Sequence, residues 1–251
     1  MRKQALVNKA AWEHRAYDFW NQGGSPEERA AQVKADPRAR LGFHKGYFED
    51  VAGKRIANPC GSNGRRAIPL ALLGADVTVF DLSGENRRYA LEVADAAGVR
   101  MEYVLGDFCE ADLNKYADVF DIVYAEGGVI HYFSDIAAFA NTLYAIIKPA
   151  GRLILSDFHP YRKTIGTGSA APTDGDYFDA RLHSVNVPYR GFFSQAEQDA
   201  FPQCLLRFYT LGEIVNAVIA VGFVLDELAE HPSFENGKLP GAFTIIAHRR
   251  G

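Results

Sequence analysis

The chain has 251 residues, a formal charge of −4 at pH 7 and 48% hydrophobic residues. This length predicts one large domain, or a domain with a cap, and the hydrophobic content is ample for a core. The net negative charge argues against nucleic acid as the main partner. Three scattered cysteines, Cys60, Cys109 and Cys204, favour reduced thiols over a disulfide framework or a metal cluster.

The first residues lack the apolar segment of a signal peptide, and no apolar run approaches the length of a transmembrane helix. We therefore expect a cytoplasmic protein with no membrane partner.

Residues 1–50 are expected to form a helical lid. Residues 5–20 read as one helix, a Gly-Gly-Ser-Pro break follows, and a second helix runs to about Lys34. Aromatic residues are frequent in this segment. Trp20 and Tyr47 are candidates for contact with a substrate. For the aromatic residues around Tyr47, the alternative is packing against the edge of the sheet.

The stretch 54–81 predicts a strand, a tight turn, a helix and a second strand. Its turn, Gly61-Ser62-Asn63-Gly64, uses residues that tolerate unusual backbone angles. Apolar residues at helical spacing follow, Gly74 ends the helix, and a β-branched strand ends in Asp81.

After Asp81 the alternation of helices and strands continues. Helices are predicted for 84–97, 134–147 and 210–221, and strands for 101–105, 120–125, 152–157, 223–229 and 242–248, with a turn at 148–151. This alternation predicts an α/β fold with a doubly wound, mostly parallel sheet. Ligands bind beyond the carboxyl ends of the strands in such sheets. Asp81, Asp107, Glu126 and His159 all lie at those ends.

The turn and the acid that follows it predict a pocket for an adenosine-like cofactor. The turn leaves free N–H groups at the start of a helix, and Asp81, twenty residues after Gly61, is placed to accept both hydroxyls of a ribose. NAD-type dinucleotides and S-adenosylmethionine both use this layout. A dinucleotide site requires G-x-G-x-x-G, and this chain has only G-x-x-G, which favours S-adenosylmethionine.

Five stretches resemble the motifs of the class I S-adenosylmethionine-dependent methyltransferases, of the bacterial small-molecule type. They are RIANPCGSNGRR (55–66), VTVFDLS (77–83), VLGDF (104–108), FDIVYAEGGVIH (120–131) and LYAIIKPAGRLILSD (143–157). The resemblance covers roughly residues 50–160 and implies a Rossmann-like, seven-stranded methyltransferase fold. S-adenosyl-L-methionine would be the cofactor and S-adenosyl-L-homocysteine the product. The chain departs from the first motif, because Asn58 replaces an acid and Cys60 and Ser62 replace glycines.

The resemblance also implies roles for individual residues. Asp81 would hold the ribose, Leu82 and Phe108 would lie beside the adenine, and Asp107 would accept from its amine. The methionine part and the transferred methyl group would be bordered by a further set: Asn58, Gly61, Asn63, Gly64, Glu126 and Gly127.

Methyl transfer from a sulfonium requires alignment of the acceptor and, where the acceptor carries a proton, a base. His131 and His159, just past strand ends, are the candidate bases, and the alternative for each is a hydrogen bond to backbone. Tyr132 and Tyr161 could form an aromatic wall for the substrate. No Asn-Pro-Pro-Tyr motif is present, which agrees with a small-molecule acceptor and not a nucleic acid.

The alternation breaks at Tyr161, and residues 161–208 read as an insertion in the cofactor-binding domain of residues 51–251. Long insertions in compact domains are usually functional. We expect a substrate cap, with a homodimer contact as the alternative. Two other functions remain open at this point, a non-catalytic cofactor- or partner-binding protein and a Rossmann-type NAD oxidoreductase.

Overall fold

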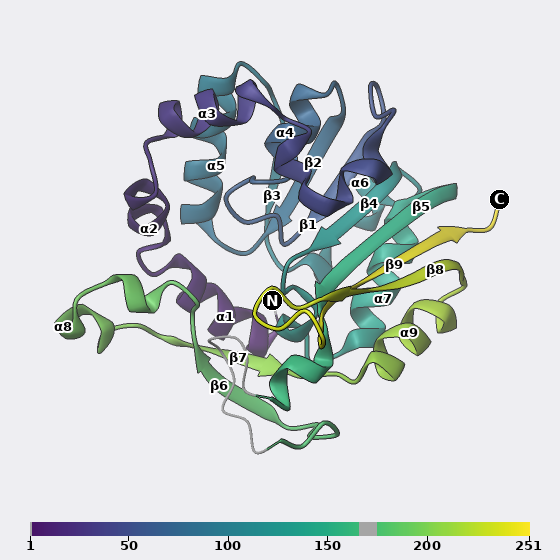
Figure 1. Ribbon diagram of the computed structural model, residues 1–251. Coiled ribbons are helices and arrows are strands. Elements are labelled where there is room, and N and C mark those ends of the chain that lie inside the picture. The colour runs from purple at the N-terminus through teal and green to yellow at the C-terminus, as the bar shows by residue number, and fades with distance from the viewer. Residues whose placement is uncertain (1, 166–174) are drawn as a thin grey trace.

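The computed structural model describes residues 2–165 and 175–251, and it contains a seven-stranded sheet (Figure 1). The strand order is β3-β2-β1-β4-β5-β9-β8, with β1 to β5 parallel and β9 antiparallel to both of its neighbours. The strands are β1 (Arg55–Pro59), β2 (Asp76–Asp81), β3 (Glu102–Leu105), β4 (Phe120–Glu126), β5 (Ile147–Phe158), β8 (Phe223–Pro232) and β9 (Pro240–Arg249). The predicted mostly parallel, seven-stranded sheet is confirmed.

Helices cover both faces of the sheet (Figure 1). The α-helices are α1 (Lys3–Glu13), α2 (Ala16–Gln22), α3 (Pro26–Ala35), α4 (Ala67–Leu72), α5 (Gly84–Ala97), α6 (Leu113–Tyr116), α7 (Ile136–Ile146), α8 (Gln195–Gln198) and α9 (Leu211–Ala220). Short 3₁₀ segments are η1 (Ala39–Phe48), η2 (Phe108–Glu110), η3 (Ile130–Tyr132), η4 (Pro160–Lys163) and η5 (Arg190–Phe192). Within the described residues, every helix is too short or too polar to span a bilayer.

The sequence of β4 explains why both faces are covered. Ile122 and Tyr124 point into the core on the side of α4 and α5, and Val123 and Ala125 point into the core on the side of α7 and α9. Side chains alternate along a strand, so a strand that is apolar at successive positions must be buried on both faces.

Two local predictions were wrong. The helix predicted over residues 5–20 is two helices, because Arg15 between α1 and α2 has a left-handed φ of 56°. The turn predicted at 148–151 belongs to β5, which begins at Ile147 and pairs with β4 through a register shift between Phe120 and Ile122.

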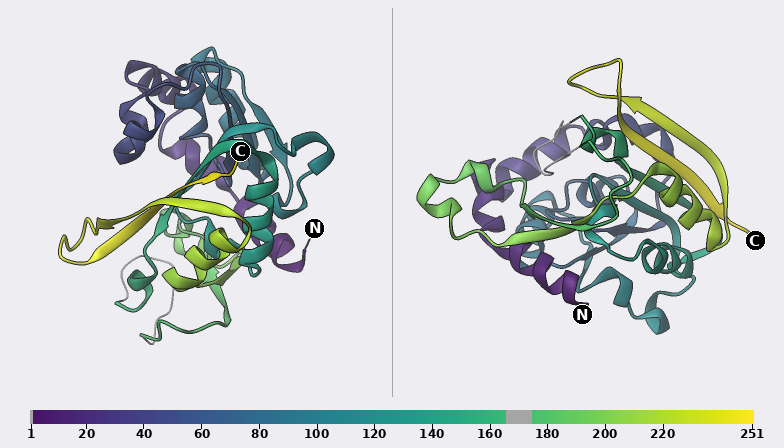
Figure 2. Two further views of the ribbon diagram at one scale, coloured as in Figure 1. Left: turned by 90° about the vertical axis from the view of Figure 1, so that its right-hand side faces the viewer. Right: turned by 90° about the horizontal axis from the view of Figure 1, so that it is seen from below.

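The described part of the 161–208 insertion packs on the N-terminal helices (Figures 1 and 2). It contains a separate two-stranded antiparallel sheet, β6 (Leu182–Asn186) with β7 (Gln203–Arg207). This sheet and α1 enclose a small core that includes Ala11, Val185 and Tyr189. Residues 166–174 of the insertion and Met1 of the expected lid lie outside the described residues. Helices α1 and α2 and the described part of the insertion therefore share one core, whereas α3 packs on α5 and η1 packs on the core beside α4.

Figure 2 shows the β8–β9 hairpin projecting beyond the helices that flank it. Phe234 in the loop of this hairpin is fully exposed.

Candidate active site

A cavity of about 180 Å³ lies beyond the carboxyl ends of β1 to β4. Nine of the ten residues expected to hold a cofactor line it: Asn58, Gly61, Asn63, Asp81, Leu82, Asp107, Phe108, Glu126 and Gly127. Arg2, Trp12 and Trp20 from the N-terminal helices contribute to its wall. We call this space the first cavity.

The turn after β1 has the backbone of a glycine-rich loop although two of its residues are not glycine. Cys60 and Ser62 have φ values of 52° and 50°, and Gly64 has 77°. All three lie in the left-handed region, which costs a non-glycine residue free energy. Gly61 is required for a different reason, since a Cβ there would lie 2.5 Å from Asn58 Oδ1. Gly64 does not line the cavity. It lies behind the turn, where an added Cβ would crowd the side chain of Ile68.

Asp81 is held in place by the turn and by the start of α5. Its carboxylate accepts from Ser62 N at 3.0 Å and from Ser83 N at 2.9 Å. Burial raises the pKa of Asp81, while these backbone N–H groups act in the opposite direction. A partly buried carboxylate that lines the cavity is a suitable acceptor for the hydroxyls of a ribose.

Asn58 and Ser62 leave polar atoms available in the first cavity. Asn58 Nδ2 donates to the carbonyl of Tyr124 at 2.8 Å. Asn58 Oδ1 and Ser62 Oγ are buried and have no hydrogen-bond partner among the described residues. A buried polar atom without a partner is costly, so both atoms indicate a bound polar group. The residues present therefore suit a cofactor with a polar aminoacyl part.

Asp107 does not present the free carboxylate that the sequence suggested. Arg2 Nε donates to its Oδ2 at 2.8 Å and Arg2 Nη2 donates to its Oδ1 at 2.9 Å. Cys109 N also donates to Oδ1, at 3.1 Å. An adenine amine would therefore have to donate to an Asp107 oxygen that already accepts from the guanidinium group of Arg2. Arg2 was missed because 105 positions separate it from Asp107 and no local pattern links them.

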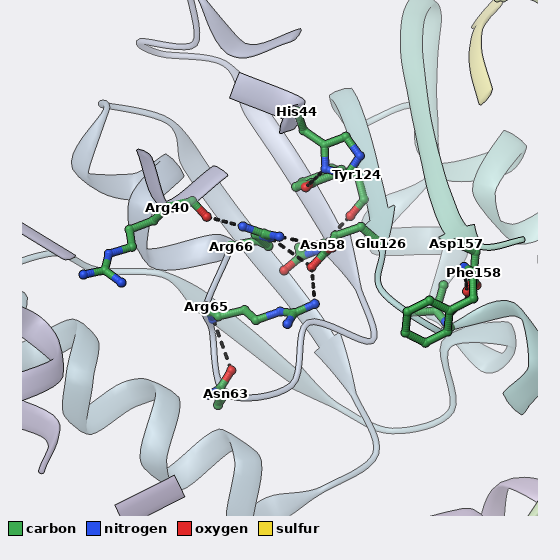
Figure 3. A network of polar contacts seen from close by, with 11 residues as sticks. Arg40, His44, Asn58, Asn63, Arg65, Arg66, Tyr124, Glu126, Asp157 and Phe158 are labelled. Atoms are coloured by element: carbon green, nitrogen blue, oxygen red, sulfur yellow. Dashed lines mark hydrogen bonds and ion pairs between the residues drawn. The ribbon is translucent and has the colours of Figure 1, made fainter. Parts of the chain in front are cut away.

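Glu126 is likewise paired, as Figure 3 shows with Arg65 and Arg66 both reaching toward it. Arg65 Nη2 lies 2.8 Å and Arg66 Nε lies 3.0 Å from Glu126 Oε1. Burial opposes ionisation of Glu126, but the two guanidinium groups outweigh it and hold its pKa below the ordinary value. Sequence reasoning missed these arginines, although an Arg-Arg pair directly after the glycine turn was a readable signal.

A second cavity, of about 360 Å³, adjoins the first. The two cavities share a wall made of Trp12, Arg65, Gly127, Gly128 and Tyr132. Beyond that wall the second cavity is lined mainly by η3, by the end of β5 with η4, and by the insertion: Ile130, His131, Asp157, Phe158, His159, Pro160, Arg162, Lys163, Pro188, Leu206, Phe208, Tyr209 and Ile214. A ligand in the second cavity would face one in the first.

The two candidate bases differ in their surroundings. His131 lines the second cavity against the rings of Tyr132 and Phe208, and burial lowers its pKa to about 4. His159 also lines this cavity, but its Nδ1 accepts from Tyr161 N at 3.1 Å and its Nε2 lies 2.9 Å from Glu230. The first contact occupies Nδ1 of His159, while its buried Nε2 stands beside Glu230 without a hydrogen bond among the described residues. No carboxylate influences His131 in this way, and we therefore prefer His131 as the candidate base.

Of the four residues expected to contact the substrate, two line a cavity and two do not. Tyr132 lies in the shared wall and Trp20 lines the first cavity, where its Nε1 donates to Asn86 at 2.8 Å. Tyr47 on η1 packs instead against the core beneath α4, and Tyr161 is turned toward solvent. Tyr47 and Tyr161 are not among the residues that line either cavity, so we do not carry them forward as substrate contacts.

Asp157 is a lining residue that the sequence marked only as a strand end. Its Oδ2 accepts from Val129 N at 2.9 Å and Ile130 N at 2.8 Å, and its Oδ1 accepts from Phe158 N at 2.6 Å. Burial raises its pKa to about 6. Asp157 therefore fixes the loop that carries His131.

Residues 59–155 match a family model described as a methyltransferase domain. A ubiquinone biosynthesis O-methyltransferase from Azorhizobium caulinodans is 27% identical over 186 residues, covering 70% of this chain and 71% of the relative. A protein of the same name from Rickettsia conorii is 30% identical over 141 residues, and this chain spans about half of its length (47%).

Two solved structures share the fold. An S-adenosylmethionine-dependent methyltransferase from Mesorhizobium loti matches with a TM-score of 0.62 and 21% identity, covering 82% of this chain and 95% of that chain. Magnesium protoporphyrin IX methyltransferase from Synechocystis, solved with bound S-adenosylhomocysteine, also has a TM-score of 0.62, with 16% identity and coverage of 98% and 100%. At these identities the structural likeness establishes the fold.

Proposed function

We propose that this chain, which belongs to the class I S-adenosylmethionine-dependent methyltransferases, methylates a small molecule bound in the second cavity. The observation that carries the proposal is the wall shared by the two cavities, because in-line displacement requires donor and acceptor to face each other. Neither the oxidoreductase nor the non-catalytic alternative has a comparable observation in its favour.

The first cavity would hold the cofactor through residues of this chain. Asp81 would accept from the ribose, Leu82 and Phe108 would flank the adenine, and Asn58 Oδ1 would accept from the aminoacyl part. Bound S-adenosyl-L-methionine would supply an activated methyl group on a sulfonium. Glu126, paired with Arg65 and Arg66, would shape the turn beside it without presenting a free charge.

For the acceptor atom we propose a hydroxyl oxygen, which the names of the curated relatives support. A hydroxyl must lose its proton, and His131 is the base that we propose for it. Burial lowers its pKa, which keeps the imidazole neutral with a lone pair available at neutral pH but makes it a weaker base than an ordinary histidine. Asp157 would act as a positioning residue through its hydrogen bonds to the loop before His131.

We also propose that the N-terminal lid and the insertion together exclude water from the reaction. Trp12 from α1 and Phe208 after β7 contribute to the walls of the second cavity. A homodimer contact through the insertion is the alternative. The formal charge of −4 supports a small-molecule acceptor over nucleic acid, and a cytosolic location remains part of the proposal.

Calorimetry with S-adenosylhomocysteine and NAD, followed by transfer of labelled methyl groups to a panel of hydroxylated aromatics, tests this function. We expect binding of S-adenosylhomocysteine but not of NAD. Asp81→Asn should raise the KM for the methyl donor, and Phe208→Ala should raise the KM for the acceptor. Phe234→Ala, in the exposed hairpin loop, is the matched control. Binding of NAD alone would overturn the proposal.

A further inference from the structure

The second cavity carries more positive than negative charge. Among the described residues that line it, Arg65, Arg162 and Lys163 have cationic side chains and Asp157 has a carboxylate. The protein as a whole has a formal charge of −4, so this excess does not follow from composition. A cationic cavity in an acidic protein indicates selection for an anionic ligand.

The carboxylate of Asp157 forms no ion pair with these three cations. Its two oxygens accept from three backbone N–H groups, those of Val129, Ile130 and Phe158. Arg65 does have a partner in Glu126, but Glu126 is shared with Arg66, so this triad keeps one positive charge in excess.

Arg162 and Lys163 come from η4, outside the wall that the two cavities share. Neither forms an ion pair with a carboxylate of the described residues. The Arg162 guanidinium lies 4.5 Å from the centre of the Phe158 ring. Lys163 Nζ lies 5.5 Å from the Phe208 ring and 3.4 Å from the carbonyl oxygen of Asp179.

The carboxylate of Asp179, whose backbone carbonyl lies beside Lys163, is paired with other side chains. Asp179 accepts from Arg181 Nε and Nη2, each at 2.8 Å, and His183 Nε2 lies 2.9 Å from it. Burial lowers the pKa of Lys163, and the charges of Asp179, Asp176 and Glu213 oppose that shift without cancelling it. Arg162 and Lys163 are thus two neighbouring cations, both lining the cavity, that form no salt bridge with a carboxylate of the described residues.

The remaining wall is apolar and largely aromatic. Trp12, Tyr132, Phe158, Phe208 and Tyr209 surround a volume of about 360 Å³. A dry apolar cavity of about 150 Å³ is known to hold one benzene ring, so this space admits a substituted aromatic ring. Flat aromatic walls favour a flat aromatic ligand.

We propose that the acceptor is an anionic aromatic compound: a hydroxylated ring with a carboxylate- or phosphate-type group that Arg162 and Lys163 hold. This inference rests on the proposed function, since it takes the second cavity as the acceptor site. It goes further by fixing which end of the acceptor lies away from the shared wall. The anionic group would bind at η4, and the hydroxyl would then face Arg65, His131 and the first cavity.

The test compares three ligands with the same dihydroxylated ring and a different group opposite the hydroxyls, two anionic and one neutral. Binding of 3,4-dihydroxybenzoate, 3,4-dihydroxybenzamide and 3,4-dihydroxyphenylphosphonate is measured by calorimetry on the full chain saturated with S-adenosylhomocysteine. We expect an anionic ligand to bind about 10–100-fold more tightly than the amide, the range for a hydrogen bond to a charged group. The preference should fall with added salt. Whichever of the benzoate and the phosphonate binds more tightly identifies the kind of anionic group that the site prefers.

The paired variant Arg162→Gln with Lys163→Gln should reduce the ratio of anion affinity to amide affinity to near one. Lys238→Gln, on the exposed loop between β8 and β9, should leave that ratio unchanged. Equal or tighter binding of the amide, an unchanged ratio in the paired variant, or no binding of either anion would each overturn the inference. Those results are separate from failure of the proposed function, which would appear as no binding of S-adenosylhomocysteine in the first place.

Discussion

The side-chain amide of Asn8 forms two hydrogen bonds with the backbone of Leu205, one accepted and one donated, as a residue on a neighbouring strand would. Asn8 Oδ1 accepts from Leu205 N at 2.7 Å, and Asn8 Nδ2 donates to Leu205 O at 3.1 Å. The same Nδ2 lies 3.3 Å from the carbonyl of Tyr132 in the shared wall. One fully buried amide thus joins the N-terminal helix, the insertion and the wall between the cavities.

Asn8→Ala should therefore loosen the lid and the insertion together. The change leaves the Leu205 N–H without this partner, at a cost of about 1–3 kcal/mol, while the Leu205 carbonyl still accepts from Gln4 Nε2 at 2.8 Å. We expect faster hydrogen exchange at Leu205 and a lower turnover, while exchange in β1 to β5 stays slow. Asn141→Ala, on an exposed face of α7, is the control. Unchanged exchange at Leu205 would show that Asn8 does not secure this unit.

Asp81→Asn should weaken binding of S-adenosylhomocysteine by about 1.5–3 kcal/mol, the range for a hydrogen bond to a charged group. The substitution keeps the shape of the side chain and removes the charge that would accept from a ribose. Asp76→Asn, at the exposed start of the same strand, should leave the affinity unchanged. Calorimetry measures both. Equal affinity in Asp81→Asn and wild type would remove Asp81 from the site.

His131→Asn should lower turnover by about 10²–10⁴, the usual contribution of a general base, with affinity for S-adenosylhomocysteine preserved. The neutral imidazole is the active form and burial lowers its pKa to about 4, so the rate should persist below pH 6 and fall as the pH approaches 4. His248→Asn, on the surface beside Asp226, is the control. A rate loss centred on pH 6.5 that disappears in His131→Asn would contradict the burial of this base.

Asp157→Asn should change how stability depends on pH. The folded chain binds the Asp157 proton more tightly than the unfolded chain, because its pKa rises from 3.8 to about 6. This contribution to stability is therefore present at low pH and is lost as the pH rises through 6. Urea unfolding of wild type and variant at pH 4 and pH 7 measures the contribution of Asp157 to the free energy of unfolding. Wild type should gain stability relative to Asp157→Asn on going from pH 7 to pH 4, and a difference that is the same at both values would refute the raised pKa.

Ser62→Gly should stabilise the protein by about 1 kcal/mol. Its φ of 50° costs a non-glycine residue about 1–2 kcal/mol, and its buried hydroxyl has no partner among the described residues. Glycine removes both costs and loses about 0.5–1 kcal/mol to the greater freedom of the unfolded chain. Ala57→Gly, in β1, should instead destabilise. Thermal unfolding without cofactor measures both changes, and a destabilised Ser62→Gly would show that the turn is not strained.

The sequence determined the architecture of the α/β domain and the place of its first cavity. Strands that are apolar at successive positions, helices with apolar spacing and glycines at turns all depend on neighbours in the chain, so their patterns can be read locally. The same patterns located Asp81 and the turn from Gly61 to Gly64, because strand ends in a parallel sheet meet at one edge.

Tertiary structure alone decided how the charges pair and what encloses the acceptor site. Arg2 reaches Asp107 across 105 positions, and Arg65 and Arg66 reach Glu126 across about 60. Long polar side chains pair with whichever charged group lies near them in the folded state. Their spacing in the sequence does not indicate which group that is. The second cavity arises in the same way. Its walls come from α1, the loops after β4 and β5, and the insertion, which lie far apart in the sequence and meet only in the folded chain.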